Sequence, residues 1–154
     1  MLMKGESGLQ AILMAGLITG VLDGLSAIAV SAYFGAGPVR VFQGIASGLL
    51  GRSAFQGGFG TALLGALLHF VIATGAAAVY YLASRSLPVL LDRALVCGVL
   101  YGVCVHLFMT FVVIPLSAIG RRPFVPQSFA AFLLVAMIVI GPSIALNIRH
   151  FSLR

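Results

Sequence analysis

The chain has 154 residues, of which 61% are hydrophobic and only 8% are charged, a balance outside the range of soluble globular domains. We therefore expect an integral membrane protein in which residues 1–154 form one domain in the lipid bilayer. The formal net charge of +6 is assigned to loop arginines near anionic headgroups, and nucleic-acid binding is not expected because no basic cluster exceeds the pair Arg121 and Arg122.

Four apolar runs match the length of about 20 helical residues that crosses about 30 Å of hydrocarbon. They cover residues 9–34, 59–83, 94–116 and 128–148. Helices are expected because each backbone polar group in lipid must be satisfied within its own segment. The sequence thus predicts an all-α, polytopic membrane protein with four transmembrane helices in an antiparallel bundle.

The N-terminal run has a second interpretation. Lys4, the apolar run and the small residues "SAIA" also fit a secretory signal peptide within residues 1–29. The apolar run continues through "VSAYF", which favours a membrane helix that is retained.

The connection between the first two spans is long enough for a short helix over residues 38–50, opened by Pro38. Apolar residues recur along one side of it, a pattern typical of an interfacial or re-entrant helix. They are Val39, Phe42, Ile45, Ala46 and Leu49. Arg40 and Arg52 flank it as interfacial loop residues. The alternative is a plain loop helix that shields the mouth of the bundle.

An acidic residue, Asp23, interrupts the first span. Gly16, Gly20 and Gly24 stand at intervals of four, a GxxxG pattern that permits close helix packing, and Asp23 falls in the same arc of the helix. Asp23 is therefore expected to face a neighbouring helix, because an unpaired carboxylate in hydrocarbon is costly.

The second and third spans each carry one histidine on a face of small residues, His69 and His106. The glycines of these faces are Gly65 in the second span and Gly98 and Gly102 in the third. Asp23, His69 and His106 each lie about 10 or 11 residues from the same membrane side, which corresponds to a common depth of roughly 15 to 17 Å. The spacing predicts an intramembrane Asp/His cluster, whereas the alternative for each residue is a neutral packing role.

The fourth span has no ionisable residue at that depth and is expected to support the others, with a kink at Pro142. Cys97 and Cys104 are seven residues apart on one helix, about 10 Å along its axis, which is too far for a disulfide and is not a metal-ligand spacing. We expect no metal site. No Ser-His-Asp, Walker or Rossmann motif is present, so no enzymatic activity is expected.

Loop charges give a weak indication of orientation, because four spans place both termini on one side. That side carries five basic residues and the opposite side four, which favours cytoplasmic termini. The first set is Lys4, Arg85, Arg93, Arg149 and Arg154, and the second is Arg40, Arg52, Arg121 and Arg122.

The second half of the chain combines several features. His69 opens the second core span, and an Arg-Ser-Leu-Pro turn follows in "AAAVYYLASRSLP". The third span is rich in glycine, contains His106 and ends at Pro115, within "GVLYGVCVHLFMTFVVIPLSAIGRRPF". The basic tail "NIRHF" lies near the end of the chain. In these features, mainly over residues 69–151, the chain resembles the YagU-type family of small bacterial inner-membrane proteins. The resemblance implies a bacterial inner-membrane location and a four-helix bundle, and it implies no reaction.

Three classes of function remain open. The cluster can be the relay or substrate site of a transport or proton-coupled permeation unit, which predicts a homo-oligomer or larger membrane complex with the Gly16, Gly20 and Gly24 face as one contact. In a structural or accessory subunit, the cluster only packs helices. In a bis-histidine electron-transfer protein, His69 and His106 would be axial ligands of a haem; otherwise no cofactor is expected.

Overall fold

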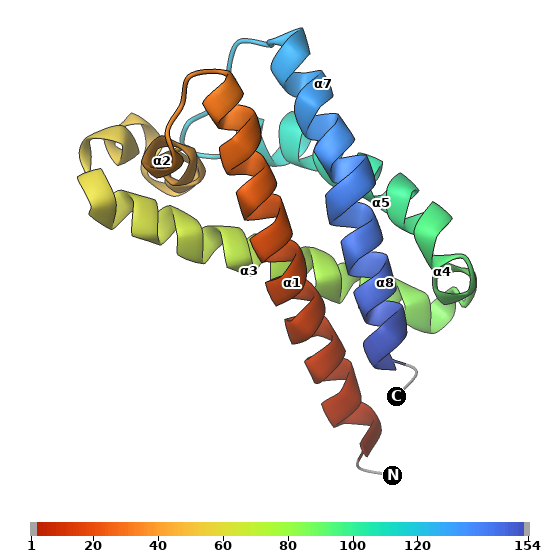
Figure 1. Cartoon of the computed structure of the whole chain (residues 1–154). Helices are drawn as coiled ribbons and strands as arrows, with labels where there is room; N and C mark the ends of the chain where they lie inside the picture. The colour runs from red at the N-terminus through yellow and green to blue at the C-terminus, as the bar shows by residue number, and fades with distance from the viewer. Residues whose placement is uncertain (1–2, 153–154) are drawn as a thin grey trace.

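The computed structural model describes the backbone of residues 3–152 and the side chains from residue 8 onward, and within this range the chain is helical without strands (Figure 1). The elements follow in chain order as α1 (Met3–Tyr33), α2 (Pro38–Leu50), η1 (Gly51–Gln56), α3 (Gly58–Ser86), α4 (Val89–Asp92), α5 (Ala94–Phe108), η2 (Met109–Val113), α6 (Ile114–Leu116), α7 (Pro126–Val135), η3 (Ala136–Ile140) and α8 (Gly141–Ser152).

Four helical stretches are long and apolar enough to cross a membrane. They are Gly8–Tyr33, Gly58–Ser86, Ala94–Leu116 and Pro126–Ser152. Each contains or closely overlaps one of the four predicted spans, so the all-helical class and the four membrane-length helices are confirmed. The third stretch joins α5, η2 and α6, and the fourth joins α7, η3 and α8.

Two of the spans contain a π-helical turn, and each of these turns stands just before a proline. η2 precedes Pro115, and η3 precedes Pro142. A proline ring clashes with the carbonyl four residues earlier and removes one backbone hydrogen bond, and a wider π turn relieves the clash without ending the helix. The disturbance expected at Pro142 therefore takes the form of a π turn in a continuous span.

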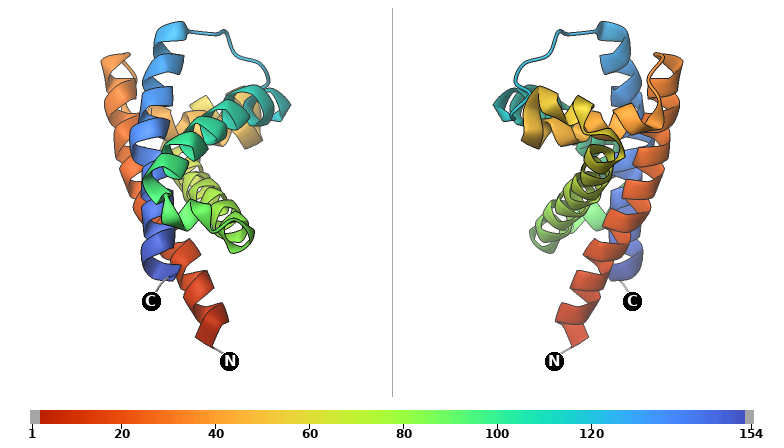
Figure 2. Two further views of the ribbon diagram at one scale, coloured as in Figure 1. Left: turned by 90° about the vertical axis from the view of Figure 1, so that its right-hand side faces the viewer. Right: turned by 90° about the vertical axis from the view of Figure 1, so that its left-hand side faces the viewer.

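The long helices are not all parallel or antiparallel to one another. α1 and the span α7 to α8 lie side by side and run in opposite directions, with the start of α1 and the end of α8 at the same end of the molecule (Figure 1). α3 crosses them obliquely, and α5 packs against α8 and η3 (Figure 2). Because of the oblique course of α3, a regular antiparallel bundle is not confirmed.

The short helix α2 lies crosswise to α1 and packs on the first half of α3 (Figures 1 and 2). Its bounds match the predicted residues 38–50. Gln43, Ala46 and Ser47 are buried, whereas Val39 and Leu49 are 42% and 61% exposed. Of the apolar residues expected along one side of this helix, Ala46 is thus buried in the protein, whereas Val39 and Leu49 are exposed.

Glycine allows α2 and α3 to approach until their backbones touch. A Cβ atom at Gly65 of α3 would collide with the backbone carbonyl of Phe42 in α2. The close crossing of the two helices therefore requires a residue without a side chain at the position of Gly65.

We predict that Gly65→Ala destabilises the protein, because an added methyl group must push α2 away from α3; overpacking of this kind costs about 1–3 kcal/mol. Gly75→Ala in the same helix is the control, because no atom lies within 4 Å of a Cβ there. The control should be neutral or gain up to about 1 kcal/mol from helix propensity. Thermal unfolding in detergent, followed by circular dichroism, measures both, and equal midpoints for the two variants would contradict the packing account.

Candidate functional site

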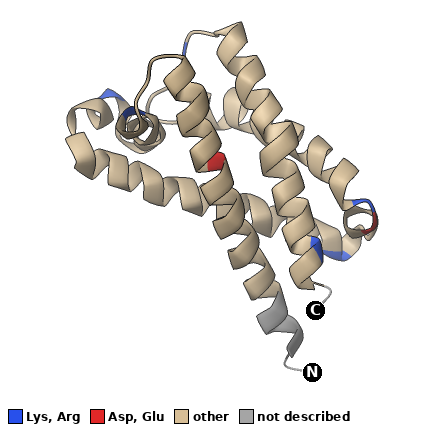
Figure 3. Ribbon diagram, in the orientation of Figure 1, with Lys and Arg blue, Asp and Glu red and all other residues tan. Residues whose placement is uncertain are grey.

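A carboxyl group and an imidazole meet where α1 crosses α3. Asp23 Oδ2 lies 4.0 Å from His69 Nε2. The same ring nitrogen lies 2.8 Å from the backbone oxygen of Gly20. A carbonyl oxygen only accepts hydrogen bonds, so His69 Nε2 carries the hydrogen and donates it to Gly20. Asp23 is the one acidic position in the middle of the spans among the residues coloured in Figure 3.

The small residues of α1 allow this meeting. A Cβ at Gly16 would lie 2.7 Å from the Thr74 Cα, and one at Gly20 would lie 2.6 Å from the Phe70 ring. At Gly24 an added Cβ would lie 3.4 Å from the imidazole nitrogen of the pair. α3 thus covers the glycine face of α1, so this face is not free for a contact between two copies of the chain.

Aromatic rings hold the His69 imidazole in place. The Phe42 ring of α2 and the Phe70 ring of α3 stand edge to face with it, at centroid distances of 6.1 and 5.5 Å. His69 is only 8% exposed, and the side chain of Asp23 is 23% exposed. The imidazole is therefore held among aromatic rings, while the carboxyl group keeps partial access to its surroundings.

A second set of polar groups, hydroxyl and amide, lies along the contact between α1 and α8. Thr19, one turn before Asp23 on the same face of α1, is 1% exposed, and its Oγ1 lies 2.8 Å from Ser143 Oγ. Asn147 Nδ2 donates to the Ser143 backbone oxygen at 2.8 Å and approaches its hydroxyl at 3.4 Å. These groups form a polar track towards the end of α8, and Thr19 could have been singled out in the sequence by its spacing from Asp23.

His106 has a different environment. Its ring packs against Phe129 of α7, with centroids 4.8 Å apart. Its Nε2 is buried without a hydrogen-bond partner. Within the described chain, no hydrogen bond or ion pair joins His106 to Asp23 or His69. The structure thus brings two members of the expected cluster together and gives the third other neighbours.

The packing of α5 explains the position of His106. A Cβ at Gly98 would lie 2.9 Å from the Gly141 carbonyl oxygen, and one at Gly102 would collide with the Ala136 carbonyl. The glycine face of α5 is therefore directed at η3 and α8, and His106 follows on that face one turn later. Equal depth along two helices does not bring their side chains together when the faces point at different neighbours.

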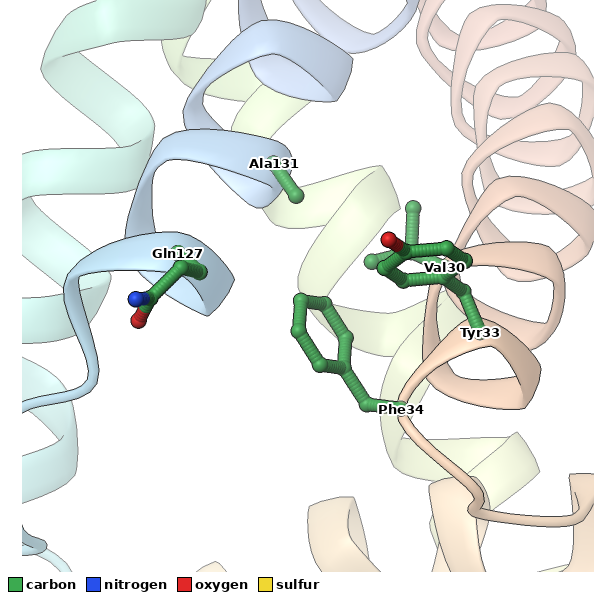
Figure 4. A pocket seen from close by; sticks show the side chains of 5 residues that line it. All are labelled: Val30, Tyr33, Phe34, Gln127 and Ala131. Carbon is green, nitrogen blue, oxygen red and sulfur yellow. The ribbon is translucent and has the colours of Figure 1, made fainter.

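An open hollow lies between the end of α1 and the start of α7. It is lined by Val30, Tyr33, Phe34, Gln127 and Ala131 (Figure 4). The ring of Phe34 points into the space between the two helices. Val30 is seven residues from Asp23, about 10 Å along the helix axis. The hollow is thus on the opposite side of the pair from the polar track.

Two other groups of predicted residues lie outside the pair. Arg40 is in the first turn of α2, where its guanidinium lies 4.9 Å above the Phe55 ring, and Arg52 is exposed in η1. Cys97 and Cys104 are free thiols. Across the described residues, no group of three or more His, Cys, Asp and Glu side chains is arranged to hold a metal ion.

No known protein family matches the chain, and neither curated proteins nor solved structures give a significant match.

We predict that Thr19→Val lowers the free energy of unfolding, because it removes the hydrogen bond to Ser143; interhelical bonds of this kind contribute about 0.6–2 kcal/mol. Ser26→Ala is the control, since the Ser26 hydroxyl bonds only to the Leu22 carbonyl of its own helix. A double-mutant cycle with Ser143→Ala isolates the pair. Additive losses in that cycle would show that the two hydroxyl groups do not interact.

Proposed function

We propose that the chain is a multi-pass protein of the bacterial inner membrane, with cytoplasmic termini, that acts as a proton-coupled transport or permeation unit. Its proton-binding site is the pair Asp23 and His69. The observation that carries the proposal is the 4.0 Å approach of these two ionisable groups in the middle of two apolar helices. Ionisable residues inside a membrane mark ion or proton pathways more often than packing contacts.

The geometry offers the imidazole two acceptors. His69 Nε2–H donates to Gly20, and the Asp23 carboxyl stands just beyond hydrogen-bond distance. A movement of about 1 Å would bring the carboxylate within hydrogen-bond reach of the ring nitrogen. A proton arriving at the pair can therefore be held as a neutral acid beside a neutral imidazole or as a carboxylate beside an imidazolium, and the Gly20 carbonyl accepts the ring N–H in either form.

Access to the pair is proposed from both ends of α1. The Thr19 and Ser143 hydroxyl groups can each donate and accept a hydrogen bond, and with Asn147 they lead towards the end of α8. On the other side, the hollow at Val30 and Phe34 opens between α1 and α7. The partly exposed carboxyl of Asp23 lies between these two features.

A structural or accessory role is the second candidate. It is favoured by the hydrogen bond from His69 to Gly20 and by the close glycine contacts, both of which pack α1 against α3. In that case the pair would stabilise one arrangement of helices, and the chain would work in a larger membrane complex. The relationship to the YagU-type family, proposed on residues 69–151, is compatible with either role.

The haem alternative receives little support from the geometry. The Nε2 of His69 is engaged by the Gly20 carbonyl, and His106 packs against Phe129 on α7. A bis-histidine site requires two free imidazole nitrogens that face one gap. We therefore propose no cofactor.

We predict that Asp23→Asn reduces proton flux into proteoliposomes to the level of empty vesicles, because the amide has nearly the same shape but cannot bind and release a proton at this position. A pH-sensitive dye inside the vesicles, with potassium and valinomycin to balance charge, measures the flux. Asp92→Asn, at an exposed position in α4, is the matched control and should retain the wild-type rate.

Two outcomes would contradict the proposal. Wild-type flux equal to that of empty vesicles would leave the accessory role as the better account. Wild-type flux that is unchanged in a folded Asp23→Asn variant would show that protons pass elsewhere.

A further inference from the structure

Four arginines gather around α2 at the end of the molecule away from the chain termini (Figure 3). Arg40 belongs to α2, Arg52 to η1, and Arg121 and Arg122 to the segment that precedes α7. We call them the arginine layer. The segment that precedes α7 is attached to α2, because the Ala118 N–H donates to the Gly48 carbonyl at 2.9 Å.

Arg122 is anchored to α2 by neutral groups alone. Its Nη2 donates to Ser47 Oγ at 2.7 Å and to the Gly44 carbonyl at 3.1 Å. Ser47 is fully buried, and burial of the guanidinium lowers the pKa of Arg122. The other two nitrogens, Nε and Nη1, donate to no group in the described chain. A guanidinium has five N–H donors in a rigid fork, so most of its donors stay available.

Arg40 lies on the same face of α2 as Gly44 and Ser47, the residues that accept the hydrogen bonds of Arg122. It precedes Gly44 by one helical turn and Ser47 by two. Its guanidinium lies 4.9 Å above the Phe55 ring, a contact that also carries no negative charge. Two guanidinium groups are thus fixed along one face of a short helix.

The described chain supplies no counter-charge for them. The acidic residues with described side chains are Asp23, in the middle of α1, and Asp92, in α4 at the other end of the molecule (Figure 3). No carboxylate within the described residues lies within ion-pair distance of the arginine layer. All four arginines are exposed, so their guanidinium groups are accessible to an anion from outside the chain.

The setting of α2 indicates which anion this is. The helix lies crosswise to α1 (Figure 1), and it exposes the apolar side chains of Val39, Leu49 and Leu50 beside the arginines. Exposed apolar residues next to arginine are typical of a helix at the membrane surface, where the phosphates of phospholipids lie. Guanidinium forks bind phosphate oxygens in a bidentate manner.

We propose that Arg122, together with Arg40, binds the phosphate of an acidic phospholipid headgroup against α2. The lipid supplies the negative charge that the chain lacks at this position. Its acyl chains cover the exposed apolar side chains of α2. The bound lipid thereby ties the segment before α7 to α2, and it stabilises the folded chain. This proposal does not depend on proton transport.

The test is the thermal unfolding of the purified full-length chain in neutral detergent after addition of lipid. Phosphatidylglycerol, phosphatidylcholine and inorganic phosphate are compared at equal phosphate concentration. Ligand that binds only the folded state raises the midpoint with concentration. We expect a saturable rise with phosphatidylglycerol in the wild type that is largely lost in Arg122→Gln.

Arg149→Gln is the matched control, because Arg149 is an exposed arginine in the last turn of α8, away from the arginine layer. It should respond to phosphatidylglycerol like the wild type. If Arg122→Gln does not fold, Arg40→Gln replaces it and should show a reduced rise.

Three results would overturn the proposal. An equal response to phosphatidylglycerol in the Arg122 and Arg149 variants would show that only overall charge matters. An equal effect of phosphatidylcholine would show that the acidic headgroup is not recognised. An equal effect of inorganic phosphate would assign the arginines to a free anion in place of a lipid.

Discussion

A carboxyl group in the middle of an apolar helix requires a polar partner, and this requirement organises the centre of the molecule. Asp23 meets His69 only because α1 presents glycines at the crossing with α3, where larger side chains would hold the two backbones apart. The His69 hydrogen bond to Gly20 then locks the crossing. Close packing and the polar pair depend on each other, since the pair needs the short distance and the partner helix hides the charge from lipid.

The remaining helices follow from this crossing. With α3 on the glycine face of α1, the last span occupies the neighbouring face, where Thr19 and Ser143 share a hydrogen bond. α5 then packs on the last span, with the backbones of Gly98 and Gly141 in contact. α2 packs on α3, and Arg40 of α2 lies with the other members of the arginine layer at one end of the molecule (Figure 3). Close contacts at glycines therefore recur between α1 and α3, between α2 and α3, and between α5 and the last span.

Much of this architecture could be predicted from the sequence, because length and hydropathy decide where a helix can cross lipid. The small-residue face of α1 could also be predicted, because it follows from helical periodicity, and the common depth of Asp23 and His69 indicated that the two could meet. Which helix packs against each face could not be predicted from these patterns. His106 lies at the expected depth, yet its helix faces α8 and its ring meets Phe129. The Arg122 contact with Ser47 joins segments 75 residues apart, and no local sequence pattern predicts it.

The central claim is that Asp23 and His69 form a coupled, proton-binding pair inside the membrane. Infrared difference spectroscopy of the protein in lipid bilayers, between acidic and alkaline buffers, tests it most directly. The account predicts a carboxyl band that changes with buffer pH, is absent in Asp23→Asn and shifts in His69→Gln. A spectrum without an Asp23-dependent band, or one in which that band ignores the loss of the imidazole, would contradict it.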